Sequence, residues 1–312
     1  TFPRLAVGPT SPLCCVRRLI QSPLFWASWT LLLEYMQIAW ITDPHLNHVP
    51  ADRWDAWVRA IEATNVGEVL ITGDISEGDD VLFELKRLSA SFDGVIRFVL
   101  GNHDFYGGAI GAVRRAIVEE ARQQERWQYL TDAGPVHWGE GCWLIGEDGW
   151  GDATIGDAES TPVLLQDFEA IEDFDGLQAE QRNQLLRELG RDSAERLRCK
   201  LADLPKDVSE IIVATHVPPF REACLYQGCV ANDEWAPFFV NGQLGDVLIR
   251  YVSSMPRVKV RVLCGHSHHA GAVQMRENLV VHAGAASYGH PDIQGILHVT
   301  NEGMSMQLVG TR

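Results

Sequence analysis

Basic residues are scarce in this sequence of 312 residues. Its 26 Lys and Arg stand against 42 Asp and Glu, which gives a formal net charge of −16 at pH 7. Extended nucleic acid and anionic membrane surfaces bind to basic faces, so we expect neither as a partner. A bound metal ion brings its own positive charge, so an acidic protein can still hold a small phosphate compound.

Paired cysteines are also lacking. The seven cysteines are scattered, odd in number and form no Cys-x-x-Cys pair. This pattern fits a reducing compartment better than a disulfide framework, and we therefore expect a cytoplasmic protein. Cys224 and Cys229 lie close together in sequence, and we interpret them as unrelated loop thiols rather than a disulfide or a zinc site.

Apolar runs of the length that crosses a membrane, about 20 residues, do not occur. The stretch from Pro23 to Leu33 follows Arg17 and Arg18 like a secretory signal, but no small-x-small cleavage site comes after it. We interpret residues 1–35 as an extraneous or N-terminal extension. An apolar helix packed on the domain and an export signal are the alternatives. The domain itself is expected at 36–312.

Five short apolar runs each end at residues that can bind a metal or move a proton. The runs end at Asp43-Pro44-His45, Gly73-Asp74, Gly101-Asn102-His103-Asp104, His216 and Gly265-His266-Ser267-His268-His269. Short β-branched apolar runs predict buried strands, and polar residues just past such strands form the ligand crevice of open α/β sheets. Carboxylate, carboxamide and imidazole groups at one sheet edge therefore predict a metal site. Histidines that cap strands or bind loop carbonyls could account for only one or two of these residues.

The order of these pieces resembles the calcineurin-like metallophosphoesterase family. It reads Asp-x-His, Gly-Asp, Gly-Asn-His-Asp, a lone His and Gly-His-x-His, and it spans residues 38 to 269. The resemblance implies an α/β fold in which two mixed β-sheets pack as a sandwich, with helices on the outside and the ligands at the carboxyl ends of strands.

The resemblance also assigns roles to individual residues. It implies that one metal is held by Asp43, His45 and His268, the other by Asn102, His216 and His266, and that Asp74 bridges them. Imidazole and carboxylate ligands suit two divalent transition metals, Mn, Fe or Zn. His103 would stabilise the transition state or protonate the leaving oxygen, and Asp104 would orient its ring or take an ordinary supporting role. The role of Glu77 is left open.

The implied activity is dinuclear, metal-dependent hydrolysis of a small phosphoester, in which a hydroxide between the metals attacks phosphorus. The Gly-Asn-His-Asp motif and the modest size favour phosphodiesters. A phosphomonoesterase or protein phosphatase of the same fold is the alternative, and a non-catalytic scaffold is a weaker one because all seven ligand positions are filled. A metallo-β-lactamase type of site would need a His-x-His-x-Asp-His block, which the sequence lacks.

Apolar residues at helical spacing predict helices between and after the strands. We expect helices at 52–64, 81–88, 109–129, 177–201 and 244–252, and further strands at 142–145, 279–282, 295–299 and 304–309, the last three in a second sheet. The segments 151–204 and 221–242 depart from the strand–helix rhythm, and we expect them to be cap-like insertions that shape the substrate pocket. For Asp148 and Trp150 a tight-turn role is favoured over contact with substrate.

Overall fold

Short β-branched runs form the strands, and amphipathic segments form most of the helices between them. The computed structural model describes residues 36–139, 141–300 and 303–309, so the expectations for residues 1–35 lie outside the described residues. The strands are β1 (Met36–Ile41), β2 (Glu68–Thr72), β3 (Val95–Val99), β4 (Trp127–Tyr129), β5 (Val136–Gly139), β6 (Cys142–Glu147), β7 (Glu210–Thr215), β8 (Leu225–Tyr226), β9 (Cys229–Val230), β10 (Lys259–Cys264), β11 (Gly271–Arg276), β12 (Leu279–Ala283), β13 (Ile293–Thr300) and β14 (Gly303–Leu308). The helices are α2 (Ala51–Ala63), α3 (Asp80–Ser91), α4 (Ile110–Ala121), α5 (Asp167–Ala170), α6 (Ala179–Ala202), α7 (Ala236–Phe239) and α8 (Gly242–Ser254), with 3-10 turns η1 (Leu46–His48), η2 (His103–Phe105), η3 (Glu172–Phe174) and η4 (Arg221–Ala223).

The first sheet has the strand order β14-β13-β1-β2-β3-β4. Strands β1 to β4 are parallel, because α2, α3 and α4 carry the chain back between them. β13 pairs antiparallel with β1, and β14 pairs antiparallel with β13. The expectation that the strands at 295–299 and 304–309 belong to a second sheet is therefore wrong. An alternating apolar pattern predicts a strand but does not say which strand it pairs with.

The second sheet has the order β11-β12-β10-β7-β6-β5. Its four central strands are parallel, and the edge strands β5 and β11 are antiparallel to their neighbours. The predicted strand at 279–282 is β12 and does lie in this sheet.

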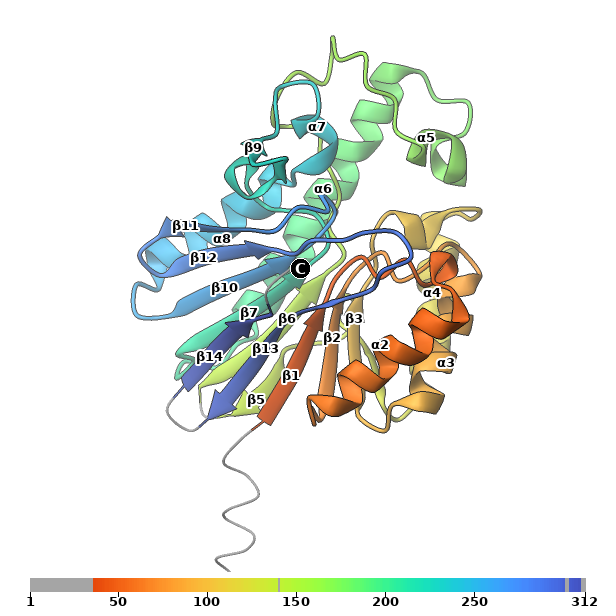
Figure 1. The fold of residues 1–312 in the computed structure, drawn as a ribbon. Helices are drawn as coiled ribbons and strands as arrows, with labels where there is room; N and C mark the ends of the chain where they lie inside the picture. The colour runs from red at the N-terminus through yellow and green to blue at the C-terminus, as the bar shows by residue number, and fades with distance from the viewer. Residues whose placement is uncertain (1–35, 140, 301–302, 310–312) are drawn as a thin grey trace, which may run out of the picture. The chain divides into compact units, whose positions relative to one another are not determined.

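The two sheets pack face to face, with helices on their outer faces (Figure 1). Side chains along a strand point alternately to opposite faces. Ile38 and Trp40 of β1 share one buried cluster with Ile212 and Ala214 of β7, and this cluster lies between the sheets. The alternate residues of the same strands join separate clusters with the outer helices. The predicted α/β sandwich of two mixed sheets with outer helices is confirmed.

One predicted helix is too long. The helix expected at 109–129 ends at Ala121, and Trp127–Tyr129 form the short strand β4 beside β3. Aromatic residues favour extended backbone on a half-buried sheet, and here that pairing overrides the helical spacing. Trp54 and Trp57 of α2 are buried in the core.

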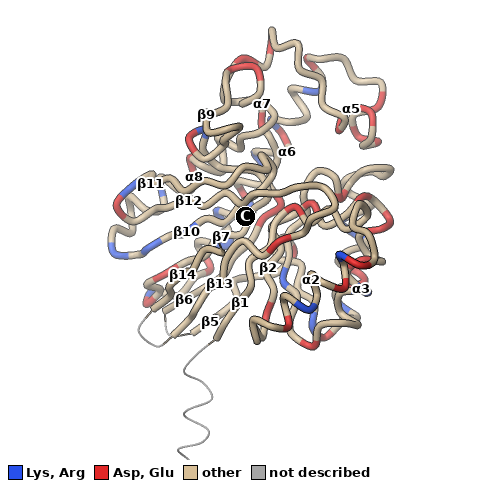
Figure 2. The backbone as a smooth tube through the Cα atoms, in the orientation of Figure 1, with Lys and Arg blue, Asp and Glu red and all other residues tan. Residues whose placement is uncertain are grey.

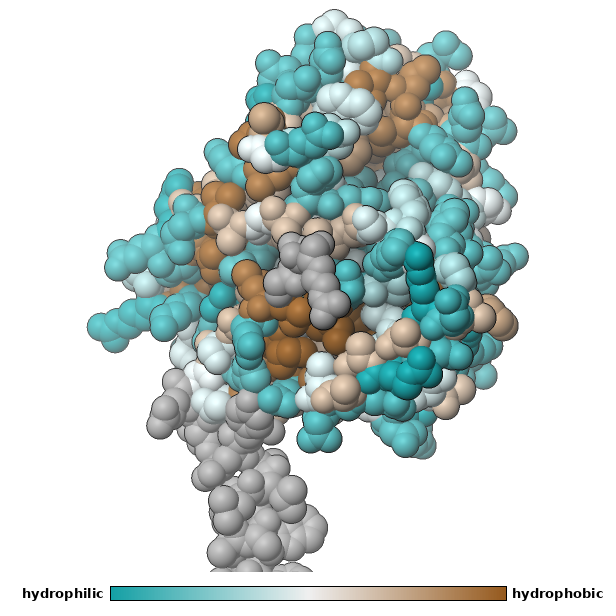
Figure 3. Space-filling model, viewed as in Figure 1, coloured by the Kyte–Doolittle hydropathy of each residue, from teal (hydrophilic) through white to brown (hydrophobic). Residues whose placement is uncertain are grey.

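The carboxyl-terminal part of α6 packs on the outer face of the second sheet, where Leu197 and Leu201 share a buried cluster with Ile211 and Val213. The segments 151–176 and 221–242 lie beyond the carboxyl ends of the strands, at the top of Figure 1. They are joined by backbone hydrogen bonds from Ala153 N to Pro237 O (2.8 Å) and from Asp157 N to Asp233 O (2.8 Å). Figure 2 shows Lys and Arg interspersed with Asp and Glu along the described chain, and Figure 3 shows apolar side chains at the surface over these upper segments. Among the described residues, no helix combines the length and apolar character needed to cross a membrane.

Candidate metal centre

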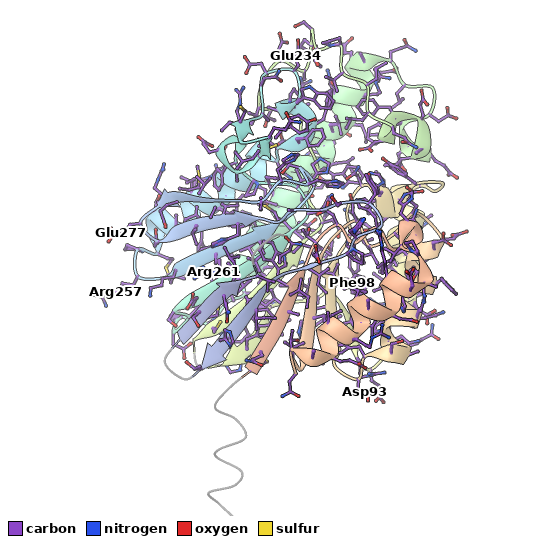
Figure 4. The ribbon with its side chains drawn as sticks, viewed as in Figure 1. Asp93, Phe98, Glu234, Arg257, Arg261 and Glu277 are labelled. Carbon is purple, nitrogen blue, oxygen red and sulfur yellow. The ribbon has the colours of Figure 1, made fainter. Side chains whose placement is uncertain are left out.

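The five predicted strand ends converge at one edge of the sandwich. Figure 4 labels Asp93, which precedes β3, near the bottom of the view and Phe98, which lies within β3, higher up. The strand therefore runs towards the upper segments and ends below them. Backbone hydrogen bonds from Asp43 N to Gly73 O (3.1 Å) and from Gly265 N to His216 O (2.9 Å) join the loops of neighbouring strands. Each sheet therefore brings part of the site to a shared edge.

Unusual backbone conformations mark these loops. Eight non-glycine residues among those described have positive φ, and five of them are predicted ligands: Asp43, His45, Asp74, His266 and His268. This left-handed region costs free energy for residues with a Cβ, and such strain gathers at functional sites because the surrounding structure maintains it. The strain thus points to the same residues as the sequence motifs.

The glycines of the motifs make room for ligand atoms. A Cβ at Gly101 would lie 2.1 Å from Asp74 Oδ1, and a Cβ at Gly265 would lie 1.9 Å from Asp43 Oδ2. Both distances are far shorter than a van der Waals contact. Each glycine therefore lets a carboxylate approach the backbone of a neighbouring loop.

The first group of candidate ligands is Asp43, His45, Asp74 and His268. One ligand atom from each lies within 4.8 Å of the others. His45 Nε2 is 3.2 Å from His268 Nε2 and 3.6 Å from Asp74 Oδ2, and His268 Nε2 is 3.3 Å from Asp43 Oδ1. The backbone N–H of His266 donates to Asp43 Oδ1 (2.9 Å) and fixes that carboxylate. This group can surround one cation.

The second group is Asn102, His216 and His266, joined by the other oxygen of Asp74. His216 Nε2 lies 3.1 Å from Asn102 Oδ1, 3.2 Å from His266 Nδ1 and 3.4 Å from Asp74 Oδ1. Asp74 therefore directs Oδ1 to this group and Oδ2 to the first. A bridging carboxylate between two cations has this arrangement.

The ring nitrogens of the second group that face inward carry lone pairs. His216 Nδ1 is 3.0 Å from the carbonyl oxygen of Thr72, and His266 Nε2 is 3.2 Å from that of Phe238. A carbonyl oxygen only accepts, so these nitrogens carry the ring hydrogens and leave His216 Nε2 and His266 Nδ1 as acceptors.

Four acceptor atoms facing one another repel unless a proton or a cation lies among them. Burial lowers the pKa of His266 to about 3 and, in the first group, that of His45 to about 4, so protons on these rings are disfavoured near neutral pH. Burial raises the pKa of Asp43, but the hydrogen bond from His268 and the nearby imidazoles outweigh it, so that carboxylate is ionised. The residues present therefore fit a pair of divalent cations.

His103 lies beside the first group with its ring partly exposed. Its ring stacks on Tyr106 at a centroid distance of 4.4 Å and meets the ring of His45 edge-on at 4.8 Å. Glu77 Oε1 lies 3.5 Å from His103 Nδ1. The same Glu77 oxygen is 3.6 Å from His48 Nε2.

Asp104 does not orient that ring. Its Oδ1 accepts from Ser76 N (2.9 Å) and its Oδ2 from Gly101 N (2.8 Å), so the buried carboxylate ties together the loops after β2 and β3. Burial raises its pKa. The expectation that Asp104 holds the His103 ring is replaced by the alternative supporting role, and Glu77 lies where the orienting group was expected.

Asp148 and Trp150 are buried. Asp148 accepts hydrogen bonds from Leu100 N (2.8 Å) and Thr131 Oγ1 (2.7 Å), and its carbonyl oxygen accepts from His216 N (2.8 Å). Asp148 therefore links the loops after β3 and β7, and its side chain is buried.

Exposed aromatic side chains lie at the site and near it. Tyr288 is 50% exposed, and its ring lies 4.4 Å from that of His45. Tyr226 lies beside His269 at 4.8 Å, and Trp235, also exposed, packs against Phe239. Tyr288 escaped the sequence reasoning because it follows β12 outside any motif.

Asp167 was also missed. It belongs to α5 in the segment 151–204 and is buried, yet it hydrogen-bonds to Asn102. Burial raises the pKa of its carboxyl group. A single Asp in an irregular segment carries no spacing signal that could have identified it.

The comparisons with known proteins agree with this geometry. The calcineurin-like phosphoesterase family model matches residues 36–270. Among curated proteins, none matches the sequence significantly.

Solved structures share the fold at low sequence identity. The phosphopantetheinyl hydrolase from Mycobacterium tuberculosis has a TM-score of 0.60 and 15% identity, over 82% of this chain and 91% of that one. A dimetal phosphatase from Danio rerio has a TM-score of 0.56 and 13% identity, over 88% and 95%. GAP50, described as the anchor in the inner membrane complex of Plasmodium, has a TM-score of 0.51 and 12% identity, over 88% and 84%.

Proposed function

Because this chain belongs to the calcineurin-like phosphoesterase family, we propose that it hydrolyses small phosphodiesters at two divalent transition-metal cations. The observation that carries the proposal is the pair of acceptor groups on either side of Asp74, one around His45 and one around His216. Metal-dependent hydrolysis of phosphoesters is the activity of the family, and the choice of diester is the finer part of the proposal.

In this proposal, the protein's own residues would position the two cations and keep the ligand rings in place. When bound, two cations would lower the pKa of a water molecule and draw charge from the phosphoryl oxygens. Asp74 would hold the two positions together, and the hydrogen bonds from His216 to Thr72 and from His266 to Phe238 would keep both rings turned inward. Because backbone carbonyl groups fix both rings, little reorganisation is needed when a substrate reacts.

His103 is the proposed group for the leaving oxygen. Its ring is 17% exposed and lies at the edge of the first group, where a substrate can reach it. Glu77 Oε1, 3.5 Å from Nδ1, would orient the ring so that Nε2 faces the leaving oxygen. A proton donated from His103 Nε2 to the leaving oxygen assists departure of a poor leaving group such as an alkoxide.

The choice of diesters over monoesters is supported by the Gly-Asn-His-Asp motif at 101–104 and by the small size of the domain. A phosphomonoesterase or a protein phosphatase would use the same ligands. A scaffold without catalysis is less well supported, because such proteins usually lose ligands and all seven positions here are filled.

For the cofactor, the partners and the compartment, we propose broad classes only. Imidazole and carboxylate ligands suit Mn, Fe or Zn. The charge of −16 supports a small substrate over extended nucleic acid. The cytoplasm remains the expected compartment on the cysteine pattern.

The segments 151–204 and 221–242 are proposed as caps over the substrate. Their support is the place of residues 151–176 and 221–242 beyond the strand ends and, in the second segment, the exposure of Tyr226 (63%) and Trp235 (46%). Large exposed aromatic rings beside a polar site are suited to contact the organic part of a phosphoester.

A panel of phosphomonoesters and phosphodiesters, assayed after chelation and again with added Mn²⁺, tests the proposal. We expect no turnover without metal, recovery with Mn²⁺, and a higher kcat/KM for a diester than for the matching monoester. Asp74→Ala should abolish turnover and lower the metal content measured by elemental analysis from two towards none or one per chain. Turnover by the chelated protein, or two metals in the Asp74→Ala variant, would refute the two-cation site; a preference for monoesters would refute only the choice of diester.

A further inference from the structure

We propose that Asp167 is a positioning residue for the second cation site: it holds the carboxamide of Asn102 with its oxygen turned towards His216 and His266. The inference rests on the proposed function and adds to it a residue from outside the strand-end motifs.

The orientation follows from hydrogen-bond chemistry. Asp167 Oδ1 lies 2.9 Å from Asn102 Nδ2, and on the other side of the same carboxamide Oδ1 lies 3.1 Å from His216 Nε2. A carboxylate oxygen only accepts, so the nitrogen of the carboxamide must face Asp167. Fixing the nitrogen fixes the oxygen, because the two are held in one plane. Without Asp167 the group can rotate and direct its N–H bonds at the cation site.

The same oxygen anchors a second residue. Tyr106 Oη donates to Asp167 Oδ1 at 2.7 Å, and the ring of Tyr106 stacks on that of His103. Asp167 thus supports both the candidate ligand Asn102 and the Tyr106 ring that stacks on His103. Asp167 is 7% exposed, so these two donors replace water as partners of its carboxylate.

Asp167 reaches this place because its segment is fastened to the loop after β3. Gly107 N donates to Ala170 O (2.7 Å), and Ile110 N donates to Asp173 Oδ2 (2.7 Å). Asp173 therefore joins the same two segments as Asp167 but contacts neither Asn102 nor Tyr106 through this bond. This makes Asp173 a matched control for the fastening of the segment alone.

The test is a calorimetric titration of the metal-free full chain with Mn²⁺. In Asp167→Ala we expect one of two Mn²⁺ sites to weaken by about 10–100-fold, the usual effect of removing a partner of a ligand, while the other site keeps its affinity. Asp167→Asn retains an acceptor oxygen at the same position and should rescue most of the lost affinity. Asp173→Ala should bind both ions like the unaltered protein.

Several outcomes would overturn the inference. Unchanged affinities in Asp167→Ala, equal weakening of both sites, no rescue by Asp167→Asn, or the same loss in Asp173→Ala would each do so. Failure of the unaltered protein to bind two Mn²⁺ ions would instead refute the proposed function.

If Asp167→Ala does not fold, the inference can be tested by exchanging the side chains of Asn102 and Asp167. Asn102→Asp places two carboxylates against each other and should weaken one Mn²⁺ site. Adding Asp167→Asn supplies a donor again and should restore part of that affinity, since contacting residues couple. Losses that simply add would contradict the proposed contact.

Discussion

His103 can be tested through the leaving group of the substrate. If its Nε2 protonates the leaving oxygen, His103→Gln should slow hydrolysis of an alkyl ester by about 10²–10⁴-fold and that of a nitrophenyl ester far less, because nitrophenolate departs unaided. Glu77→Gln should give a weaker form of the same pattern, since Glu77 only faces the ring. The measurement is kcat for both esters at saturating Mn²⁺.

His48→Gln is the control for this experiment. His48 also lies close to Glu77, at 3.6 Å, but it is exposed and was not assigned to the site. Its replacement should leave the ratio of the two rates unchanged. A uniform loss with both esters in His103→Gln would assign that ring to the charge on the phosphoryl oxygens instead.

At the scale of residues, sequence order was sufficient to gather the seven candidate ligands. Parallel strands end at a common edge, so residues that directly follow them must meet. The partners of those residues could not be predicted in the same way. Asp104 follows His103 directly, yet its carboxylate faces two backbone N–H groups, while Glu77 approaches the ring from another loop.

At the scale of elements, the tight loops after the strands should not tolerate a side chain where a ligand passes. Gly265→Ala would bring a Cβ to 1.9 Å from Asp43 Oδ2 and 2.1 Å from Thr42 Oγ1, so the carboxylate must move. We expect Mn²⁺ affinity of the first group to fall by about 10–100-fold while the circular dichroism spectrum is retained.

Gly134→Ala is the matched control, because a Cβ there meets no atom within 4 Å. It should bind two Mn²⁺ ions with unchanged affinity. Full metal occupancy in Gly265→Ala would mean that the loop after β10 moves freely and that the glycine is not required by the ligand.

The sequence predicted the central strands better than the edges. Continuous β-branched runs such as those of β2 and β7 are buried on both faces and leave little ambiguity. The edge strands β5 and β11 went unrecognised because alternate residues are exposed and the apolar signal is weak. β4 was absorbed into a helix because it has three residues only.

At the scale of the whole molecule, the buried histidines should make the metal-free protein sensitive to acid. Burial lowers the pKa of His45 to about 4, although Asp74 and Asp43 partly offset it, whereas the unfolded chain binds the proton near pH 6.5. The unfolded state therefore takes up the proton first as pH falls, and the free energy of unfolding decreases between about pH 6.5 and 4. His45 alone should account for about 2 kcal/mol at pH 5.

Denaturant unfolding at pH 7 and pH 5, with a chelator present, measures this effect. In His45→Gln the decrease between the two values should be smaller by about 2 kcal/mol. His137→Gln, at an exposed position, should keep the decrease of the unaltered protein. An equal decrease in His45→Gln would show that folding does not lower the pKa of His45.

The pairing of β1 with β13 also has a kinetic consequence. Gln37 Nε2 lies 3.3 Å from His298 Nδ1, a contact between residues 261 positions apart. During synthesis, β1 therefore keeps one edge unpaired until β13 has emerged, and closing so long a loop is slow. An unpaired edge beside Ile38 and Trp40 is a template for strands of other copies. Substitutions in β13 should accordingly lower the yield of folded protein before they alter the rate of hydrolysis.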